Sequence, residues 1–406
     1  MKAVEIAENI YFIGANIKNG DLFEGMWPIP DGVSLNSYIV KGEKTALIDL
    51  VRDWDNAPGA LKEQLASLNI DINNIDYLVL NHLEPDHTGW LCEFLKLNPK
   101  VTILTTQLGK NLVKGFYKNE DNVQIVKDGE KLDLGNNMEL TFYTAPNVHW
   151  PETMVTYNEK SGVLFSCDAF GSYGCVDNPF DDQLDDEKHA FYDRESLRYY
   201  ANIVASFSPF VQKAIDKLAS LDIKMIAPSH GIIWRENPSV IIERYRRFAE
   251  YMNGPAEPEI TIIWGSMYGN TESALAPLID GIKSEGVTVH LHQVPNEDVS
   301  FPLTSAYKSA GLVFAMPTYE YRMFPPVAAA IDMFGRKHLK NKKVLRIGSY
   351  GWSGGAQKEF DSITADYNWD CLEPVEWQGG CDEDTKKIIY EQGKKLAKTV
   401  KEFCGA

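Results

Sequence analysis

Two histidines and two carboxylates lie within one short stretch of the chain, which is an unusual density of groups that can bind metal. The segment reads His82-Leu83-Glu84-Pro85-Asp86-His87 and directly follows the β-rich run Tyr77-Leu78-Val79-Leu80. Side chains that leave a tight loop at the end of a strand can diverge toward two adjacent ions, so this spacing indicates a pair of metals. The alternative is a polar loop that holds two histidines by chance, although the whole chain has only 8 histidines.

Three further residues repeat the plan of an apolar strand that ends in a possible metal ligand. They are His149 after residues 140–143, Asp168 after residues 163–167, and His230 after residues 225–229. Because the ends of neighbouring strands lie along one edge of a sheet, we expect these side chains to converge on a common point. The other four histidines, His189, His290, His292 and His338, lack such a setting and are assigned no role.

A second kind of site is indicated after the strand predicted at residues 260–264. The next residues are Gly265-Ser266-Met267-Tyr268-Gly269-Asn270-Thr271, and a helical pattern starts at residue 272. Hydroxyl groups, the backbone N–H groups of a turn that contains glycine, and a helix N-terminus can together hold a phosphate without a lysine. Neither the Walker A motif nor the dinucleotide fingerprint is present, so a mononucleotide fits better. A plain helix N-cap is the alternative.

Two later loops support the cofactor interpretation. Met316-Pro317-Thr318-Tyr319-Glu320 follows a strand predicted at 311–315, and Gly348-Ser349-Tyr350-Gly351-Trp352-Ser353-Gly354 follows one at 343–347. Doubly wound sheets bind ligands at the carboxyl ends of their parallel strands. The glycines permit close approach of the backbone, and the aromatic rings can contact an isoalloxazine ring, although such rings are also common packing residues.

The elements that must position these residues fall into two predicted domains, at 1–252 and 259–406. Residues 253–258 concentrate turn formers and are predicted to be a linker. The first domain alternates short β-rich runs with turns and helical patterns. The second shows regular β-α alternation, which predicts a doubly wound parallel sheet.

Composition excludes several classes of function. A net charge of −17 would repel nucleic acid and anionic lipid, which bind clustered lysine and arginine. No apolar run approaches the roughly 20 residues that span a bilayer, so no membrane partner is expected. The N-terminal sequence lacks the pattern of a signal peptide, and the six dispersed cysteines form no C-x-x-C pair. We therefore expect a cytoplasmic protein with reduced thiols.

The run His82-x-Glu84-x-Asp86-His87, followed by His149, Asp168 and His230, resembles the flavodiiron proteins (A-type flavoproteins). The segment from Gly348 to Gly354 is similar to the flavin loop of the same family. The resemblance implies an α/β protein in which a metallo-β-lactamase-like αββα sandwich precedes a flavodoxin-like domain, in the two-domain class without a fused rubredoxin.

The cofactors implied by the resemblance are FMN and two non-haem iron ions. One iron would bind His82, Glu84 and His149, the other would bind Asp86, His87 and His230, and Asp168 would bridge them. The residues predicted to bind FMN are Ser266, Met267, Tyr268, Gly269, Asn270, Thr271, Pro317, Thr318, Tyr319, Ser349, Tyr350, Gly351, Trp352 and Gly354. Glu320, where the family often has a neutral residue, is expected to lower the reduction potential of the flavin.

The activity implied by the resemblance is that of an oxygen reductase, a nitric oxide reductase, or both. Electrons from an external donor, such as a rubredoxin or a reduced deazaflavin coenzyme, would pass through FMN to the irons. There they would reduce dioxygen to water or nitric oxide to nitrous oxide. The family forms head-to-tail homodimers, in which the FMN of one chain faces the irons of the other, so we expect such a dimer or a dimer of dimers.

Two alternatives stay open from the sequence. A zinc hydrolase could use the same ligands with an accessory flavodoxin-like module, and Glu84 could then act as a base. However, hydrolases of this superfamily carry a histidine where this chain has Glu84, and an anionic oxygen ligand shifts the preference from zinc toward iron. The second alternative is an electron carrier with an inert metal-binding domain.

Overall fold

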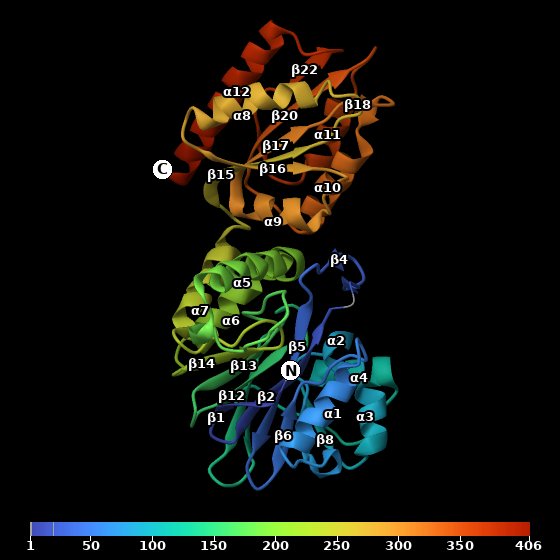
Figure 1. Cartoon of the computed structure of the whole chain (residues 1–406), viewed down its shortest axis with the longest axis vertical. Helices are drawn as coiled ribbons and strands as arrows, with labels where there is room; N and C mark the ends of the chain where they lie inside the picture. Colours follow the sequence, from blue (N-terminus) through green and yellow to red (C-terminus); the bar gives the residue numbers. More distant parts are fainter. Residues whose placement is uncertain (1, 19) are drawn as a thin grey trace. The chain divides into compact units, whose positions relative to one another are not determined.

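The computed structural model describes residues 2–18 and 20–406, and the chain divides into two compact units. The first comprises Met1–Tyr200 and Pro209–Arg246, and the second comprises Ala201–Ser208 and Arg247–Ala406. Figure 1 shows the strands and helices of each unit. Within the described residues, no helix combines the length and the apolar character needed to cross a membrane.

Two sheets form the centre of the first unit. The larger has the order β1-β2-β5-β6-β7-β8-β9, with strands Val4–Ala7, Ile10–Ile17, Val33–Lys41, Thr45–Ile48, Tyr77–Val79, Thr102–Thr105 and Val123–Ile125. The smaller runs from β10 to β14, with strands Lys131–Asp133, Glu139–Thr144, Met154–Asn158, Val163–Cys167 and Met225–Pro228. Strands β6 to β9 are parallel to one another, as are β13 and β14, so within each set the carboxyl ends lie at one edge.

The core of this unit lies between the two sheets. Phe12 and Tyr38 of the larger sheet join one hydrophobic cluster with Phe142 and Phe165 of the smaller sheet. Helices cover the outer faces: α1 (Ala57–Ser67), α3 (Leu91–Leu97) and α4 (Gln107–Tyr117) on one side, and α6 (Ser208–Leu218) and α7 (Pro238–Glu250) on the other (Figure 1). The predicted αββα sandwich is confirmed.

The second unit is a doubly wound parallel sheet, as predicted. Its strand order is β16-β15-β17-β20-β21, and β22 also pairs with β20. The strands are Glu257–Trp264 (β15), Thr288–Gln293 (β16), Ser309–Ala315 (β17), Lys343–Tyr350 (β20), Asp370–Cys371 (β21) and Val375–Gln378 (β22). Strand β16 lies on one side of β15, and the strands that follow it in the sequence lie on the other side, beginning with β17. This fold binds ligands at such a change of side, between β15 and β17.

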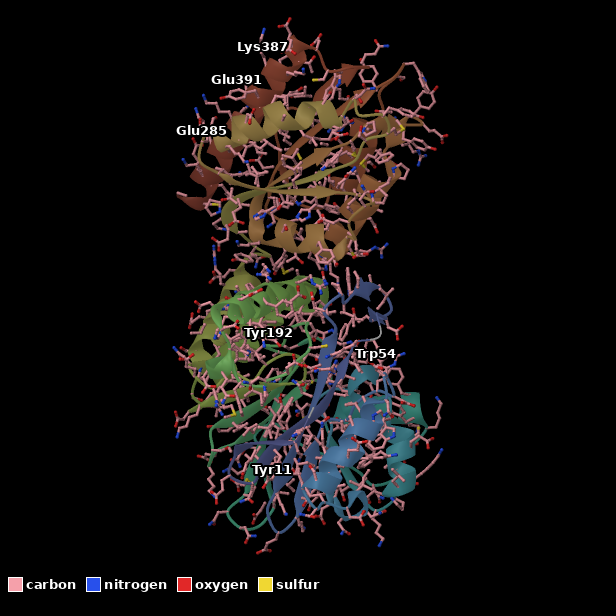
Figure 2. All side chains as sticks on the ribbon, in the orientation of Figure 1. Tyr11, Trp54, Tyr192, Glu285, Lys387 and Glu391 are labelled. Carbon is pink, nitrogen blue, oxygen red and sulfur yellow. The ribbon has the colours of Figure 1, made fainter. Side chains whose placement is uncertain are left out.

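Helices pack on both faces of this sheet (Figure 1). They are α8 (Leu275–Lys283) and α12 (Glu383–Cys404) on one face, and α9 (Ser300–Lys308), α10 (Pro325–Arg336) and α11 (Ala356–Thr364) on the other. The closing helix α12 begins after Asp382, whose side chain accepts the N–H of Thr385. Its outer side carries exposed charges, Lys387 and Glu391 among them (Figure 2).

Two predicted element boundaries differ from the structure. Strand β15 begins at Glu257, so its first two residues fall within the segment 253–258 that was predicted to be a linker. The pairing of β15 with β17 is irregular between Glu257 and Ile260, where Pro258 cannot donate a backbone hydrogen bond. The helix predicted from residue 272 starts instead as a 3-10 turn, Glu272–Ala274, before α8. The domain limits at 252 and 259 stay a prediction.

Candidate metal centre and flavin site

The predicted metal ligands all lie where strands end. His82 and Glu84 occupy the loop after β7, and Asp86 and His87 lie in the short helix α2 (Pro85–Thr88) that follows it. Pro85 suits the first position of this helix because its ring fixes φ and its missing N–H has no helical partner there. His149, Asp168 and His230 follow β11, β13 and β14.

The structure brings six of the seven side chains together in two groups of three. In the first, Oε2 of Glu84 lies 3.3 Å from Nε2 of His82 and 3.0 Å from Nε2 of His149. In the second, the two carboxylate oxygens of Asp86 lie 3.5 Å from Nε2 of His87 and 3.2 Å from Nε2 of His230. The grouping is the one that the resemblance implies.

Asp168 lies between the two groups. Its Oδ2 is 3.4 Å from Nε2 of His82 and 3.2 Å from Nε2 of His149. Its Oδ1 is 3.0 Å from Nε2 of His87 and 3.3 Å from Nε2 of His230. One carboxylate oxygen therefore faces each group, which is the arrangement that a bridging ligand needs.

The chemistry of the donor set fits two metal ions. Among the described residues, buried Oδ2 of Asp86, Oδ2 of Asp168 and Nε2 of His230 have no hydrogen-bond partner, although they lie close to one another. Buried polar atoms are rarely left in this state unless another group satisfies them. Three carboxylates and four imidazoles that point at a common space supply ligands of the types that iron and zinc accept.

Electrostatics lead to the same conclusion. Burial would lower the pKa of His230, but the carboxylates of Asp168 and Asp86, 3.3 Å and 3.2 Å from its Nε2, outweigh burial and raise this pKa to about 10. Burial would raise the pKa of Asp168, but the surrounding imidazoles hold it well below its usual range. Asp168 is therefore ionised, and the negative charge of the cluster requires positive charge, which metal ions provide in place of protons.

Two of the histidines are oriented by residues that the sequence did not single out. Nδ1 of His82 lies 2.8 Å from Oε1 of buried Glu152, and Nδ1 of His230 donates to the carbonyl oxygen of Ser34 over 2.8 Å. Because these acceptors hold the proton on Nδ1, Nε2 of each ring is left to bind metal. Glu152 follows His149 by three residues, and an acidic residue so near a ligand was the available signal.

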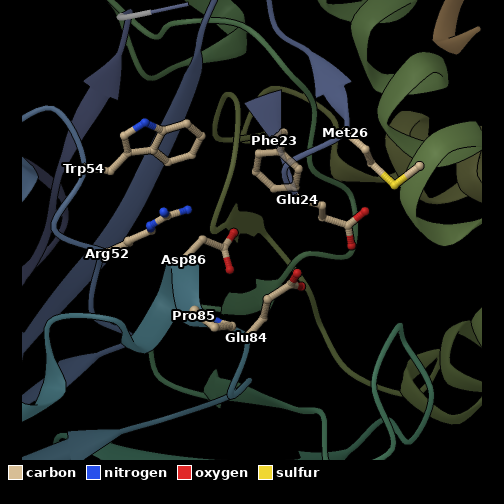
Figure 3. Close-up of a pocket in the computed structure, with 8 residues that line it drawn as sticks. All are labelled: Phe23, Glu24, Met26, Arg52, Trp54, Glu84, Pro85 and Asp86. Carbon is tan, nitrogen blue, oxygen red and sulfur yellow. The ribbon is translucent and has the colours of Figure 1, made fainter. Parts of the chain in front are cut away.

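A pocket of about 460 Å³ opens beside the metal ligands. Figure 3 shows the carboxylates of Glu84 and Asp86 facing the same space as the guanidinium of Arg52. Phe23, Met26 and Trp54 are also among the residues that line the pocket. A small molecule can thus reach the metal ligands, next to a cation and apolar walls that the sequence analysis missed.

The first predicted flavin loop joins β15 to the 3-10 turn. The hydroxyl of Ser266 accepts a hydrogen bond from the N–H of Gly269 over 3.0 Å. The backbone of Gly269 has a φ of 84°, so this position favours glycine. Thr271 does not cap the following turn; its hydroxyl lies 3.3 Å from that of Ser349 in the third loop. The N-cap alternative is therefore wrong for Thr271. Asn270, Met267 and Tyr268 are exposed, Tyr268 at 90%.

The other two loops lie beside one another at the same edge of the sheet. A Cβ on Gly355 would come within 2.2 Å of the carbonyl oxygen of Tyr321, and Nε1 of Trp352 donates to the hydroxyl of Tyr321 over 3.2 Å. Trp352 is 77% exposed and Tyr319 is 40% exposed, so their faces are available to a ligand. Among the described residues, the buried hydroxyl of Thr318 has no hydrogen-bond partner, which fits a polar ligand in this crevice. The remaining predicted residues, Pro317, Tyr350, Gly351 and Gly354, belong to the same two loops.

Both domains match known protein families. Residues 33–231 match the family described as ODP family beta lactamase, and residues 262–393 match the flavodoxin family. The anaerobic nitric oxide reductase flavorubredoxin of Vibrio vulnificus is 33% identical over 401 residues, which cover 97% of this chain and 79% of that protein. The chain belongs to the flavodiiron protein family. The flavorubredoxin of Escherichia coli K12 is 32% identical, with 98% and 82% coverage.

Solved structures of flavodiiron proteins share the whole fold. Rubredoxin oxygen:oxidoreductase from Desulfovibrio gigas matches with a TM-score of 0.93 and 29% identity, covering all of both chains. The flavodiiron protein from Giardia intestinalis also matches with a TM-score of 0.93, at 26% identity, over 100% of this chain and 98% of the other. This flavodiiron protein is thus an FMN and di-iron oxidoreductase, and the zinc hydrolase alternative is not favoured.

Proposed function

We propose that this flavodiiron protein reduces dioxygen to water, nitric oxide to nitrous oxide, or both. The observation that carries the proposal is Asp168, whose two oxygens face two groups of ligands beside an open pocket. When bound, FMN and the irons supply the electrons that either reduction consumes. The related proteins named above include a nitric oxide reductase and an oxygen oxidoreductase.

The proposed ligands assign a role to each side chain. His82, Glu84 and His149 would hold one iron, and Asp86, His87 and His230 would hold the other. Asp168 would bridge the two ions. The carboxylates of Glu84 and Asp86 line the pocket, so they stand beside the place where a diatomic molecule enters.

Tyr199 is proposed to supply a hydrogen bond or a proton at the edge of this site. Its ring lies 5.7 Å from the ring of His230, between centroids, and within the described part of the chain its buried hydroxyl has no hydrogen-bond partner. Burial, together with the nearby carboxylates, raises the pKa of Tyr199 well above its usual value, so the phenol stays protonated. A neutral phenol can donate to an oxygen atom in the site.

The substrate is identified by measuring how the same reduced protein is reoxidised by each gas. Protein with FMN and iron is reduced without air and then mixed separately with dioxygen or nitric oxide. After mixing with at least one of the gases, we expect the absorption spectra of the flavin and of the irons to become those of the oxidised protein. Reoxidation by one gas alone identifies the substrate, and a reduced protein that is stable toward both gases would contradict the proposal.

We also propose a head-to-tail homodimer that receives electrons in the cytoplasm from an external rubredoxin or a reduced deazaflavin coenzyme. The dimer predicts that two inactive variants complement each other. Asp168→Ala removes the bridge between the irons, and Ser266→Glu places a carboxylate where the phosphate is expected to bind. Random mixing makes half of the dimers mixed, each with one complete pair of sites, so we expect about one quarter of wild-type turnover.

The control for complementation is each variant alone, which should be inactive. Different affinity tags on the two chains confirm that mixed dimers have formed. If verified mixed dimers show no recovery, electrons do not cross between the chains and the head-to-tail arrangement is wrong.

A further inference from the structure

Arg346 is a buried cation at the flavin edge of the second unit. It lies on β20, two residues before Gly348, and only 1% of its surface is exposed. Its neighbours on the strand, Leu345 and Ile347, are fully buried apolar residues. A guanidinium rarely occupies such a place without ionic partners, and removing the partner of a buried charge is strongly unfavourable. The position therefore calls for a specific role.

Within residues 2–18 and 20–406, the guanidinium has one ionic partner and one weaker contact. Nη1 lies 2.5 Å from Oε1 of Glu376, and Nη2 donates to the carbonyl oxygen of Met316 over 3.4 Å. Nε is buried and, among the described residues, has no hydrogen-bond partner. Glu376 is partly exposed, with 29% of its side chain accessible. The positive end of the pair is thus inside the unit and the negative end is nearer to water.

The pair lies directly against two of the three flavin loops. Met316 is the first residue of the second loop, and Gly348 is the first of the third. A Cβ on Gly348 would come within 1.7 Å of the Met316 carbonyl oxygen and 3.2 Å of Nη2 of Arg346, so glycine leaves room for the guanidinium. Glu376 pairs with Gly348 across β20 and β22, and its carboxylate lies 3.7 Å from the place of a Cβ on Gly354.

We propose that Arg346 and Glu376 are positioning residues for FMN and that their charges set the reduction potential of the bound flavin. The guanidinium favours the reduced flavin, which carries more negative charge than the oxidised form, and the carboxylate opposes it. Because the pair contacts the start of both loops, it also fixes their separation. The inference rests on the proposed electron path through FMN.

The test compares midpoint potentials of the full-length, flavin-loaded protein, measured by spectroelectrochemistry without air. Arg346→Met leaves the Glu376 carboxylate without its positive partner. We therefore expect the affinity for reduced flavin to fall about tenfold relative to the affinity for oxidised flavin. For a two-electron couple this ratio lowers the potential by about 30 mV. Glu376→Gln leaves the guanidinium unopposed and should raise the potential by a similar amount. A merely structural role would not give shifts of opposite sign.

Two further variants separate the effect of charge from a loss of folding. Arg346→Lys keeps the positive charge but lacks the planar guanidinium group with its several hydrogen-bond donors. The variant should therefore have a flavin potential near the wild-type value but bind FMN more weakly. Arg336→Met removes an exposed arginine paired with Asp332 in the same unit and should leave the potential unchanged. If Arg346→Met does not fold, the flavin potentials of Glu376→Gln and Arg346→Lys are compared with that of the wild type instead. Shifts of the same sign, or no shift with FMN bound, would overturn the proposal, whichever gas the irons reduce.

Discussion

Replacing Asp168 with alanine is expected to abolish reductase turnover while FMN stays bound. Asp168 is the residue whose carboxylate contacts Nε2 of all four histidines in the cluster, with one oxygen toward each pair. Its removal takes one ligand away from each of the two proposed metal positions and leaves Glu84 and Asp86 as the carboxylates beside the two histidine pairs. Loss of groups that only orient a metal ligand costs 10–100-fold, so we expect turnover to fall by at least about 100-fold.

The measurement combines iron content, FMN content and turnover on the same preparation. Iron should fall from two ions per chain to one or none, whereas the flavin spectrum should stay that of the wild type, because the flavin loops belong to the other unit. Asp181→Ala is the matched control. Asp181 is also a buried carboxylate of the first unit, but it accepts the backbone N–H groups of Arg235 and Glu236. An Asp168→Ala protein with full iron and turnover would remove Asp168 from the centre.

The positions of the predicted metal ligands follow from the sequence because all of them come after apolar strands, four in one run and three singly. Asp168 follows five buried residues, and His230 follows a strand that pairs with the same one in parallel. Parallel pairing places the two ends at one edge of the smaller sheet. The run from His82 to His87 follows β7, which is parallel to its neighbours in the larger sheet. Strand ends and polarity therefore predict which side chains converge, whereas their assignment to two irons comes from the family resemblance and stays a prediction.

The groups that support these ligands could not be predicted, because they depend on how distant segments pack. Glu152 reaches His82 across 70 residues of sequence, and the carbonyl of Ser34 reaches His230 across 196. Arg346 interrupts an apolar strand, between Leu345 and Ile347, and its partner Glu376 is identified only by the pairing of β22 with β20. A sequence pattern fixes which side of an element is buried, but not which buried atoms meet.

The flavin loops show an intermediate case. Their position after β15, β17 and β20 follows from the β-α alternation, so the loops themselves were predicted. The start of α8 was predicted three residues too early, because the residues after Thr271 form a 3-10 turn before the helix. Pro277 has no N–H to donate to the carbonyl of Ser273, and its ring would clash with that carbonyl in a regular α-helix, so α8 begins only at Leu275, where Pro277 falls in the first turn.

Replacing Glu84 with histidine is expected to change the metal that the centre prefers. Oε2 of Glu84 lies between His82 and His149, at 3.3 Å and 3.0 Å from their Nε2 atoms. A third imidazole at this position removes one anionic oxygen and leaves a set of three histidines with Asp168. Nitrogen ligands suit zinc, and zinc binds a given site more tightly than ferrous iron does, so the carboxylate is the group that opposes zinc here.

The preference is measured by adding equal amounts of ferrous iron and zinc to metal-free protein without air and analysing the bound metals. We expect wild type to retain iron in the presence of zinc more fully than Glu84→His, and the variant to lose reductase turnover because zinc has no redox chemistry. Glu84→Asp, which keeps the charge on a shorter side chain, should stay closer to wild type in its metal ratio than Glu84→His does. If Glu84→His binds the two metals in the wild-type ratio, the preference for iron arises outside this ligand. The remaining carboxylates, Asp86 and Asp168, would then be the residues to exchange, because they supply the other anionic oxygens of the proposed metal centre.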